Sequence, residues 1–182
     1  DISKNSVLLL GSFTDDIDYI FLKKLSEHIS TKLILIGPKK ISKPAKELNF
    51  KCLIDNENVH WLGPMEPSRF LGYLENCKVG IISYDNDNNL KNKLRSPLKA
   101  IGYLAANKCI ISNIDCEIPA LLDKAIYVVP DEDTYFRYID KCFEGTLNFD
   151  QDAVDKYLSS IDYNNLISLI FKKLGERLLP IL

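Results

Sequence analysis

The sequence predicts an α/β fold in which a doubly wound, Rossmann-like parallel sheet of about six strands is covered by helices on both faces. Two observations lead to this prediction. Short, continuously apolar runs alternate along the chain with longer segments whose apolar residues recur at helical spacing. The apolar runs also lack the in–out alternation of a sheet that has one face in water. Fully buried strands joined by helices form parallel sheets with right-handed crossovers, which gives this fold.

Each predicted strand is an apolar run, and the first three end at a glycine. The expected strands span residues 7–10, 33–36, 59–62, 79–82, 109–111 and 125–129. Gly11, Gly37 and Gly63 follow the first three strands, and a glycine lets the backbone come close to a ligand. Ligands of such sheets bind beyond the carboxyl ends of the strands. These glycines therefore either line a binding site or only form tight turns.

The segments between the strands predict helices, and two of them carry clear start signals. Asp15 or Asp16 is suited to cap the first helix, and Ser96 followed by Pro97 is a typical helix start. Residues 85–93 are rich in Asn and Asp and indicate a loop. The expected helices span residues 15–30, 45–48, 67–77, 96–106, 118–122, 132–143 and 150–179, the last of them broken near Asp162.

Composition and charge argue against several classes of protein. The 182 residues carry a formal net charge of −2, whereas a general nucleic-acid surface needs a basic excess. No apolar run approaches the roughly 20 residues that cross a bilayer, and the first residues lack the pattern of a signal peptide. Five cysteines without a C-x-x-C pair favour reduced thiols in the cytoplasm. His28 and His60 are far apart in sequence, so we expect no metal site.

The most informative stretch joins a basic loop to the start of a helix. Lys91, Lys93 and Arg95 precede Ser96, and Lys99 follows one turn into the helix. A helix start offers unpaired backbone N–H groups and the positive end of the helix dipole, which together suit phosphate oxygens. In a nearly neutral protein, this local positive charge favours a small polyanion as ligand. A solvated surface loop without a ligand is the alternative interpretation.

Residues 95–112 resemble the segment S-P-x-K-x-x-E-Y-L-A-x-G-K-P-V-V-S of GT-B glycosyltransferases, in the group that builds bacterial surface polysaccharides. Four earlier segments are similar to that family in the same order. They are residues 7–12 (its first strand and glycine loop), 33–38 (its second strand), 58–63 (its N-V-x-F-L-G segment) and 79–84 (its V-x-I-I-P-Y segment). The resemblance extends over residues 6–140.

The resemblance implies that a nucleotide-diphosphate sugar binds as the donor substrate, UDP-linked rather than GDP-linked, without a metal or a further cofactor. Lys99 and Ser96 would hold the diphosphate, and Gly11 and Ser12 would line it from the opposite side. The loop after Gly63 would meet the base. The complete set of expected donor-binding residues is Gly11, Ser12, Gly63, Tyr84, Lys93, Ser96, Lys99, Gly102 and Tyr103.

By the resemblance, Tyr84 would lie near the base or sugar. Several positions depart from the family pattern. Gly102 replaces the glutamate that usually bonds the ribose of the donor, and position 94, the other acidic position, is Leu94. The sequence therefore predicts neither the catalytic residues nor the stereochemistry. Residues 12–16 are acidic where some relatives carry Arg and Lys, which lowers the expected affinity for a diphosphate. Asn107 replaces the glycine after the helix, a mild change because Asn tolerates a left-handed conformation.

By this resemblance the chain is the C-terminal, donor-binding half of a two-domain enzyme. We expect a single domain over residues 1–182, with a Rossmann-like core at 6–145 and a C-terminal helical segment at 146–182. The N-terminal acceptor domain would be a separate part and the partner of this one. Alone, this half should bind the donor without transferring a hexose. The full protein is expected in the cytoplasm, at or near the inner face of the membrane, with a glycan or lipid-linked acceptor.

Two other functions stay open at this point. A degenerate, non-catalytic module for assembly or protein contacts would agree with Gly102 and with the acidic first loop. A flavodoxin-like or receiver-like signalling domain shares the alternating pattern. A receiver, however, needs clustered acids at the end of its first strand, and Asp15 and Asp16 come later than that. The sequence also permits a core position for Trp61 and Tyr103.

Overall fold

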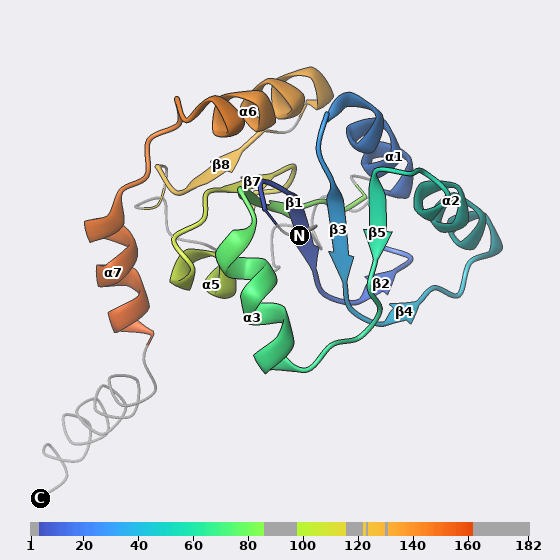
Figure 1. Cartoon of the computed structure of the whole chain (residues 1–182), viewed down its shortest axis with the longest axis horizontal. Coiled ribbons are helices and arrows are strands. Elements are labelled where there is room, and N and C mark those ends of the chain that lie inside the picture. Colours follow the sequence, from blue (N-terminus) through green and yellow to red (C-terminus); the bar gives the residue numbers. More distant parts are fainter. Residues whose placement is uncertain (1–3, 86–97, 116–121, 123, 130, 162–182) are drawn as a thin grey trace, which may run out of the picture.

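The structure is a computed structural model that describes residues 4–85, 98–115, 122, 124–129 and 131–161. Its centre is a six-stranded sheet in which every pairing is parallel (Figure 1). The strands are β1 (Val7–Leu10), β3 (Leu33–Ile36), β5 (Val59–Trp61), β6 (Val79–Ile82), β7 (Ile110–Ser112) and β8 (Ile126–Val128). The sequence-based prediction of a six-stranded parallel sheet is therefore confirmed.

The order of the strands identifies the doubly wound topology. The strand order in the sheet is β5-β3-β1-β6-β7-β8. The strands β3 and β5 are added on one side of β1, and β6, β7 and β8 are then added on its other side. The strand order reverses between β1 and β6, which is the switch point where ligands of such sheets bind. This order differs from that of flavodoxin-like and receiver domains, whose second strand in sequence lies at the edge. The signalling-domain alternative is therefore wrong.

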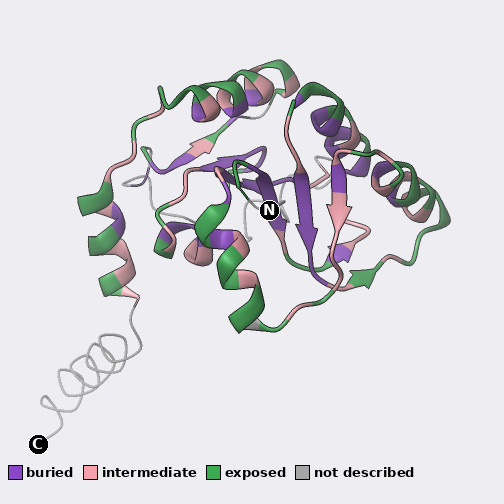
Figure 2. Cartoon of the chain, viewed as in Figure 1, coloured by how far each residue is buried: buried purple, intermediate pink, exposed green. Residues whose placement is uncertain are grey.

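Helices cover both faces of the sheet, as expected. One buried cluster joins the sheet to α1 (Tyr19–His28), α2 (Pro44–Ile54) and α6 (Glu132–Glu144). A second cluster joins the opposite face to α3 (Pro67–Asn76), α5 (Leu98–Ala105) and α7 (Gln151–Ser160). Figure 2 shows β1 and β3 buried between these layers, with exposed residues on the outer sides of the helices. Within the part of the chain that the structure describes, no helix is long and apolar enough to cross a membrane.

The first helix begins later than the sequence predicted. Its N-cap is Asp18, whose carboxylate accepts a hydrogen bond from the Phe21 N–H at 3.0 Å, rather than Asp15 or Asp16. The residues before it form β2 (Phe13–Thr14), which pairs in parallel with β4 (Lys39–Lys40) in a small second sheet. These pairs of residues are too short to give a periodic pattern, so the sequence did not indicate them.

The other helices agree with the sequence in existence and differ in extent. α2 is eleven residues long, where only a short helix at 45–48 was expected. Asn107 has a φ of 56°, which confirms the left-handed conformation expected at the end of α5. The expected helix at 118–122, apart from Leu122, and the C-terminal residues from Asp162 onward lie outside the described residues.

The glycine loops at the carboxyl ends of β1, β3 and β5 are joined to one another by backbone hydrogen bonds. The Gly11 N–H donates to the Ile36 carbonyl at 3.0 Å, and the Gly37 N–H donates to the Gly63 carbonyl at 2.8 Å. A Cβ at Gly37 would lie only 2.0 Å from the Gly11 carbonyl oxygen, so the two backbones touch where a side chain would stand. Gly37 also has a φ of 145°, which strongly favours glycine. These contacts fix the loop that carries Gly11.

On the other face, the ring of Tyr103 from α5 lies directly against β6. An added Cβ at Gly80 would meet the Tyr103 Cγ atom at 2.4 Å, so only a glycine admits the ring at this depth. Tyr103 is fully buried. The close approach of α5 to the sheet therefore depends on the missing side chain of Gly80.

We expect Gly80→Ala to destabilise the protein by roughly 1–3 kcal/mol or more, because the added methyl group overpacks this contact. Gly72→Ala is the matched control. It lies in α3 with nothing within 4 Å of its added Cβ, and should stabilise the helix by about 1 kcal/mol. Urea unfolding of both variants measures the difference. Equal stabilities for Gly80→Ala and the unmodified protein would contradict the tight contact.

Candidate functional site

The pairing of β1 with β6 stops before the carboxyl ends of the two strands, and we call this separation at the switch point the crevice. The two strands pair only at Val7↔Val79 and Leu8↔Gly80, although β1 continues to Leu10 and β6 to Ile82. Beyond the last pair, the Tyr103 hydroxyl bonds the backbone groups of β1 that no longer pair with β6. It donates to the Leu8 carbonyl at 2.8 Å and accepts from the Leu10 N–H at 2.9 Å. The strand ends thus separate at the switch point without leaving these two backbone groups unbonded.

Burial raises the pKa of the Tyr103 phenol well above its ordinary value, so the hydroxyl keeps its proton and remains a donor. Tyr103 is fully buried and its hydroxyl is occupied on both sides. It was expected among the donor-binding residues. The structure places it below the crevice, where it holds β1, β6 and α5 together rather than facing solvent.

Lys99 lies one helical turn before Tyr103, on the same face of α5. Its Nζ atom is 3.5 Å from the point where a Cβ on Gly11 would stand, and 5.0 Å from the centre of the Tyr84 ring. Gly11 directly follows β1, and Tyr84 lies two residues after β6. The structure therefore brings three expected residues, Gly11, Tyr84 and Lys99, together at the switch point. The arrangement sets a positive charge over an exposed backbone loop.

Tyr84 is held in place by a residue that the sequence did not single out. Asn113 follows β7, and its side-chain oxygen accepts the Tyr84 N–H at 3.0 Å while its amide nitrogen donates to the Tyr84 carbonyl at 2.7 Å. Asn113 is 8% exposed. An asparagine after a strand usually indicates a turn, so the sequence carried no signal for this pairing with a distant segment.

The remaining expected site residues fall into three groups. Ser12 is exposed beside Gly11, and Gly63 has a φ of 69° with open space where a side chain would be. Gly102 lies beside α3, and a Cβ added to it would be 3.8 Å from a Leu74 methyl carbon. Lys93 and Ser96, with Lys91 and Arg95, lie outside the described residues.

The acidic first loop is arranged differently from what the sequence suggested. The Asp15 carboxylate accepts hydrogen bonds from the N–H groups of Ser42 and Lys43, each at 3.0 Å, and from the Ser42 hydroxyl. The Ser42 hydroxyl, followed by the Lys43 N–H, lowers the pKa of Asp15. This charge holds the loop before α2. The Asp85 carboxylate similarly pairs with Lys46, and the Asp85 N–H donates to the Asp16 carbonyl at 2.8 Å.

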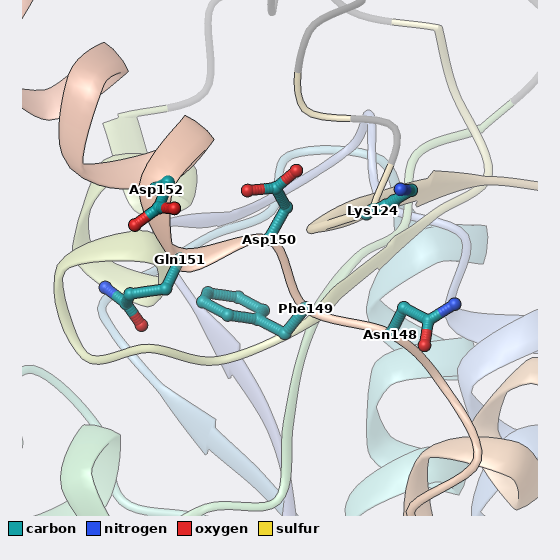
Figure 3. A pocket seen from close by; sticks show the side chains of 6 residues that line it. All are labelled: Lys124, Asn148, Phe149, Asp150, Gln151 and Asp152. Atoms are coloured by element: carbon teal, nitrogen blue, oxygen red, sulfur yellow. The ribbon is translucent and has the colours of Figure 1, made fainter.

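Two hollows of similar volume are lined by residues other than Gly11, Tyr84 and Lys99. One, of about 440 Å³, surrounds the start of α7 near the amino end of β8 (Figure 3). The other, of about 460 Å³, lies on the opposite face of the sheet, among the starts of α1, α2 and α6. Polar and charged side chains of both signs line the second hollow, among them Lys24, Lys46, Asp85 and Glu132. Among the described residues, no three His, Cys, Asp or Glu side chains gather as metal ligands would.

Comparison with known proteins defines the fold. No family model matches the sequence, and no curated protein sequence is similar enough to be a relative. Solved glycosyltransferase structures do match. HepE of Anabaena, solved with UDP and glucose, has a TM-score of 0.72 at 10% identity over 96% of this chain and 49% of its own.

Two further structures agree. AviGT4, a glycosyltransferase of avilamycin A biosynthesis, has a TM-score of 0.66 at 14% identity over 99% of this chain and 53% of its own. WaaB, a lipopolysaccharide outer core galactosyltransferase, has a TM-score of 0.60 at 18% identity, covering 93% and 50%. This chain thus spans about half the length of each. It has the fold of a domain of GT-B glycosyltransferases, as the sequence motifs predicted.

Tyr103→Phe should destabilise the protein by about 1–3 kcal/mol, since the Leu8 carbonyl and the Leu10 N–H lose their partner in a buried position. Tyr127→Phe is the control, because its hydroxyl bonds the Asn148 carbonyl at an exposed site where water can replace it. Urea unfolding measures the stabilities, and hydrogen exchange should show faster exchange of the Leu10 amide in Tyr103→Phe alone. Unchanged protection of that amide would argue against the bridging role of the hydroxyl.

Proposed function

We propose that this chain is the donor-binding half of a glycosyltransferase and that the crevice at the switch point holds the diphosphate of a nucleotide-diphosphate sugar. The observation that carries the proposal is the position of the Lys99 ammonium, over Gly11 and beside Tyr84. A ligand at this point would meet a full positive charge and a backbone without a side chain in the way. The carboxyl edge of a doubly wound sheet is the expected place for such a ligand.

The chemistry of the site suits a diphosphate leaving group. When the bond from sugar to phosphate breaks, negative charge grows on the diphosphate, and Lys99 stands where it would stabilise that charge. Ser96, Lys93 and the start of the helix would add hydrogen bonds and positive potential from the adjacent segment. The Gly63 loop, two strands away on the same edge, would receive the base. HepE was solved with UDP, which supports a uridine nucleotide as the first ligand to test.

The whole reaction needs more than this chain. We propose that an acceptor-binding domain completes the active site and that the full protein transfers a hexose to a glycan or lipid-linked acceptor, in the cytoplasm and near the membrane. The chain spans about half the length of the similar glycosyltransferases, which supports this division. The present domain would then supply donor binding and stabilisation of the leaving group.

We expect Lys99→Ala to weaken UDP binding about tenfold or more, because a charge-assisted hydrogen bond to phosphate is lost. Lys141→Ala is the matched control: Lys141 also lies 5.0 Å from a tyrosine ring, that of Tyr138, but on α6. Calorimetry or an NMR titration with UDP, and with GDP for comparison, gives the affinities. UDP should bind more tightly than GDP. No nucleotide binding to the unmodified domain would contradict the proposal and favour a non-catalytic module.

Gly102→Glu should tighten UDP binding about tenfold, since the carboxylate would supply the ribose contact that the family's glutamate makes. The site has room, because the nearest side-chain atom to an added Cβ is 3.8 Å away. Gly102→Ala is the control for helix stability alone. The gain should vanish with a UDP analogue that lacks the 2′- and 3′-hydroxyl groups. An equal gain in Gly102→Ala would show that the carboxylate is not responsible.

A further inference from the structure

We propose that Tyr84 and Asn113 are positioning residues, which together fix the ammonium group of Lys99 over Gly11 before any ligand binds. The positioning is a property of the unliganded domain, and its consequence for affinity rests on the proposed function. It assigns a role to Asn113 and changes the role of Tyr84. The resemblance implied a place for Tyr84 near the base or sugar, and its ring here lies beside a cation of the same protein.

The first step is the grip of Asn113 on the backbone of Tyr84. The register of β6 with β7 ends at Ile82↔Ser112, and Asn113 is the first residue after β7. Its amide then continues the pairing, with one bond to the Tyr84 N–H and one to the Tyr84 carbonyl. Only one orientation of the amide satisfies both groups, because its oxygen must accept and its nitrogen must donate. Asn113 is buried and both bonds are partly buried, which limits their exposure to water.

The second step is the position of the Tyr84 ring. With its N–H and carbonyl both bonded, the backbone of Tyr84 cannot turn without breaking a partly buried hydrogen bond. The half-buried side chain packs against the apolar clusters of both faces of the sheet. The ring therefore stays at the mouth of the crevice. There it presents its electron-rich π system 5.0 Å from the Lys99 Nζ atom.

The third step is the effect on Lys99. A lysine has a flexible four-carbon stem, so its charge is normally spread over many positions, and ordering it costs entropy when a ligand binds. Tyr103 fixes the helix under Lys99, and Tyr84 attracts its far end. A charge already held at the switch point binds an anion more tightly, because less ordering remains to be done. Tyr84 and Asn113 thus act on a diphosphate through Lys99.

The test uses NMR of the domain after reductive methylation of its lysines with ¹³C-formaldehyde, which keeps the positive charge. A lysine over an aromatic ring gives methyl signals shifted upfield by the ring current. Lys141, at 5.0 Å from the Tyr138 ring, is the internal reference. Lys99→Arg and Lys141→Arg assign the two signals by removing them. We expect an upfield Lys99 signal in the absence of nucleotide.

Variants then separate positioning from folding. Tyr84→Leu and Asn113→Ala should return the Lys99 signal to the region of the exposed lysines, and Tyr84→Phe, which keeps the ring face, should retain the upfield signal. Tyr138→Leu should move only the Lys141 signal, and an unchanged Lys141 signal in the other variants shows that they are folded. On unmethylated protein, Tyr84→Leu and Asn113→Ala should bind UDP about tenfold more weakly, with most of the affinity recovered in Tyr84→Phe.

Each outcome decides one point. An unshifted Lys99 signal in the unmodified domain, or an upfield signal that persists in Tyr84→Leu, overturns the inference. Loss of the signal with no change in UDP affinity also overturns it, because the position of Lys99 would then not matter for binding. An upfield signal that behaves as expected, in a domain that binds no nucleotide, supports the positioning and overturns the proposed function instead.

Discussion

The hydroxyl group of Tyr103 stands between β1 and β6, in a place where the two strands no longer pair. It satisfies the Leu8 carbonyl and the Leu10 N–H, so β1 keeps its hydrogen bonds while its end moves away from β6. The ring reaches this depth because Gly80 has no side chain. The opening of the crevice, the height of α5 above the sheet and the place of Lys99 all depend on this one buried contact.

The candidate site combines rigid and charged parts in a way that suits an anionic ligand. Backbone hydrogen bonds between glycine loops fix Gly11, and the amide of Asn113 fixes Tyr84, so two sides of the crevice are set by the sheet itself. Lys99 contributes the charge from a helix anchored one turn further on. Electrostatic stabilisation is most effective when the charged group is already in place, because no reorganisation is then needed as the ligand's charge develops. The Asp15 carboxylate is engaged with the loop before α2, so its structural role there accounts for an acidic residue in the first loop.

Three of the residues expected at the candidate site lie together in the structure, and the reasons for what the sequence missed are physical. Gly11, Tyr84 and Lys99 were all expected, since each follows a strand or begins a helix at the carboxyl edge, and such ends must meet in a parallel sheet. Asn113 was missed because its partner is 29 residues away and its own neighbourhood resembles an ordinary turn. β2 and β4 were missed because two-residue strands carry no periodicity, and their pairing joins loops that are distant in sequence.

The alternation of apolar runs with amphipathic segments determined the parallel α/β architecture, because strands buried on both faces and joined by helices have few other ways to cover their surfaces. The motif order further indicated the glycosyltransferase fold. Only the tertiary structure decided that the Tyr103 hydroxyl bonds the backbone of β1, that Asp15 holds a loop, and that the Lys99 ammonium lies over Gly11. These roles depend on which distant residues a side chain contacts. A pattern along the sequence gives the spacing of residues but does not show which residues meet in the folded chain.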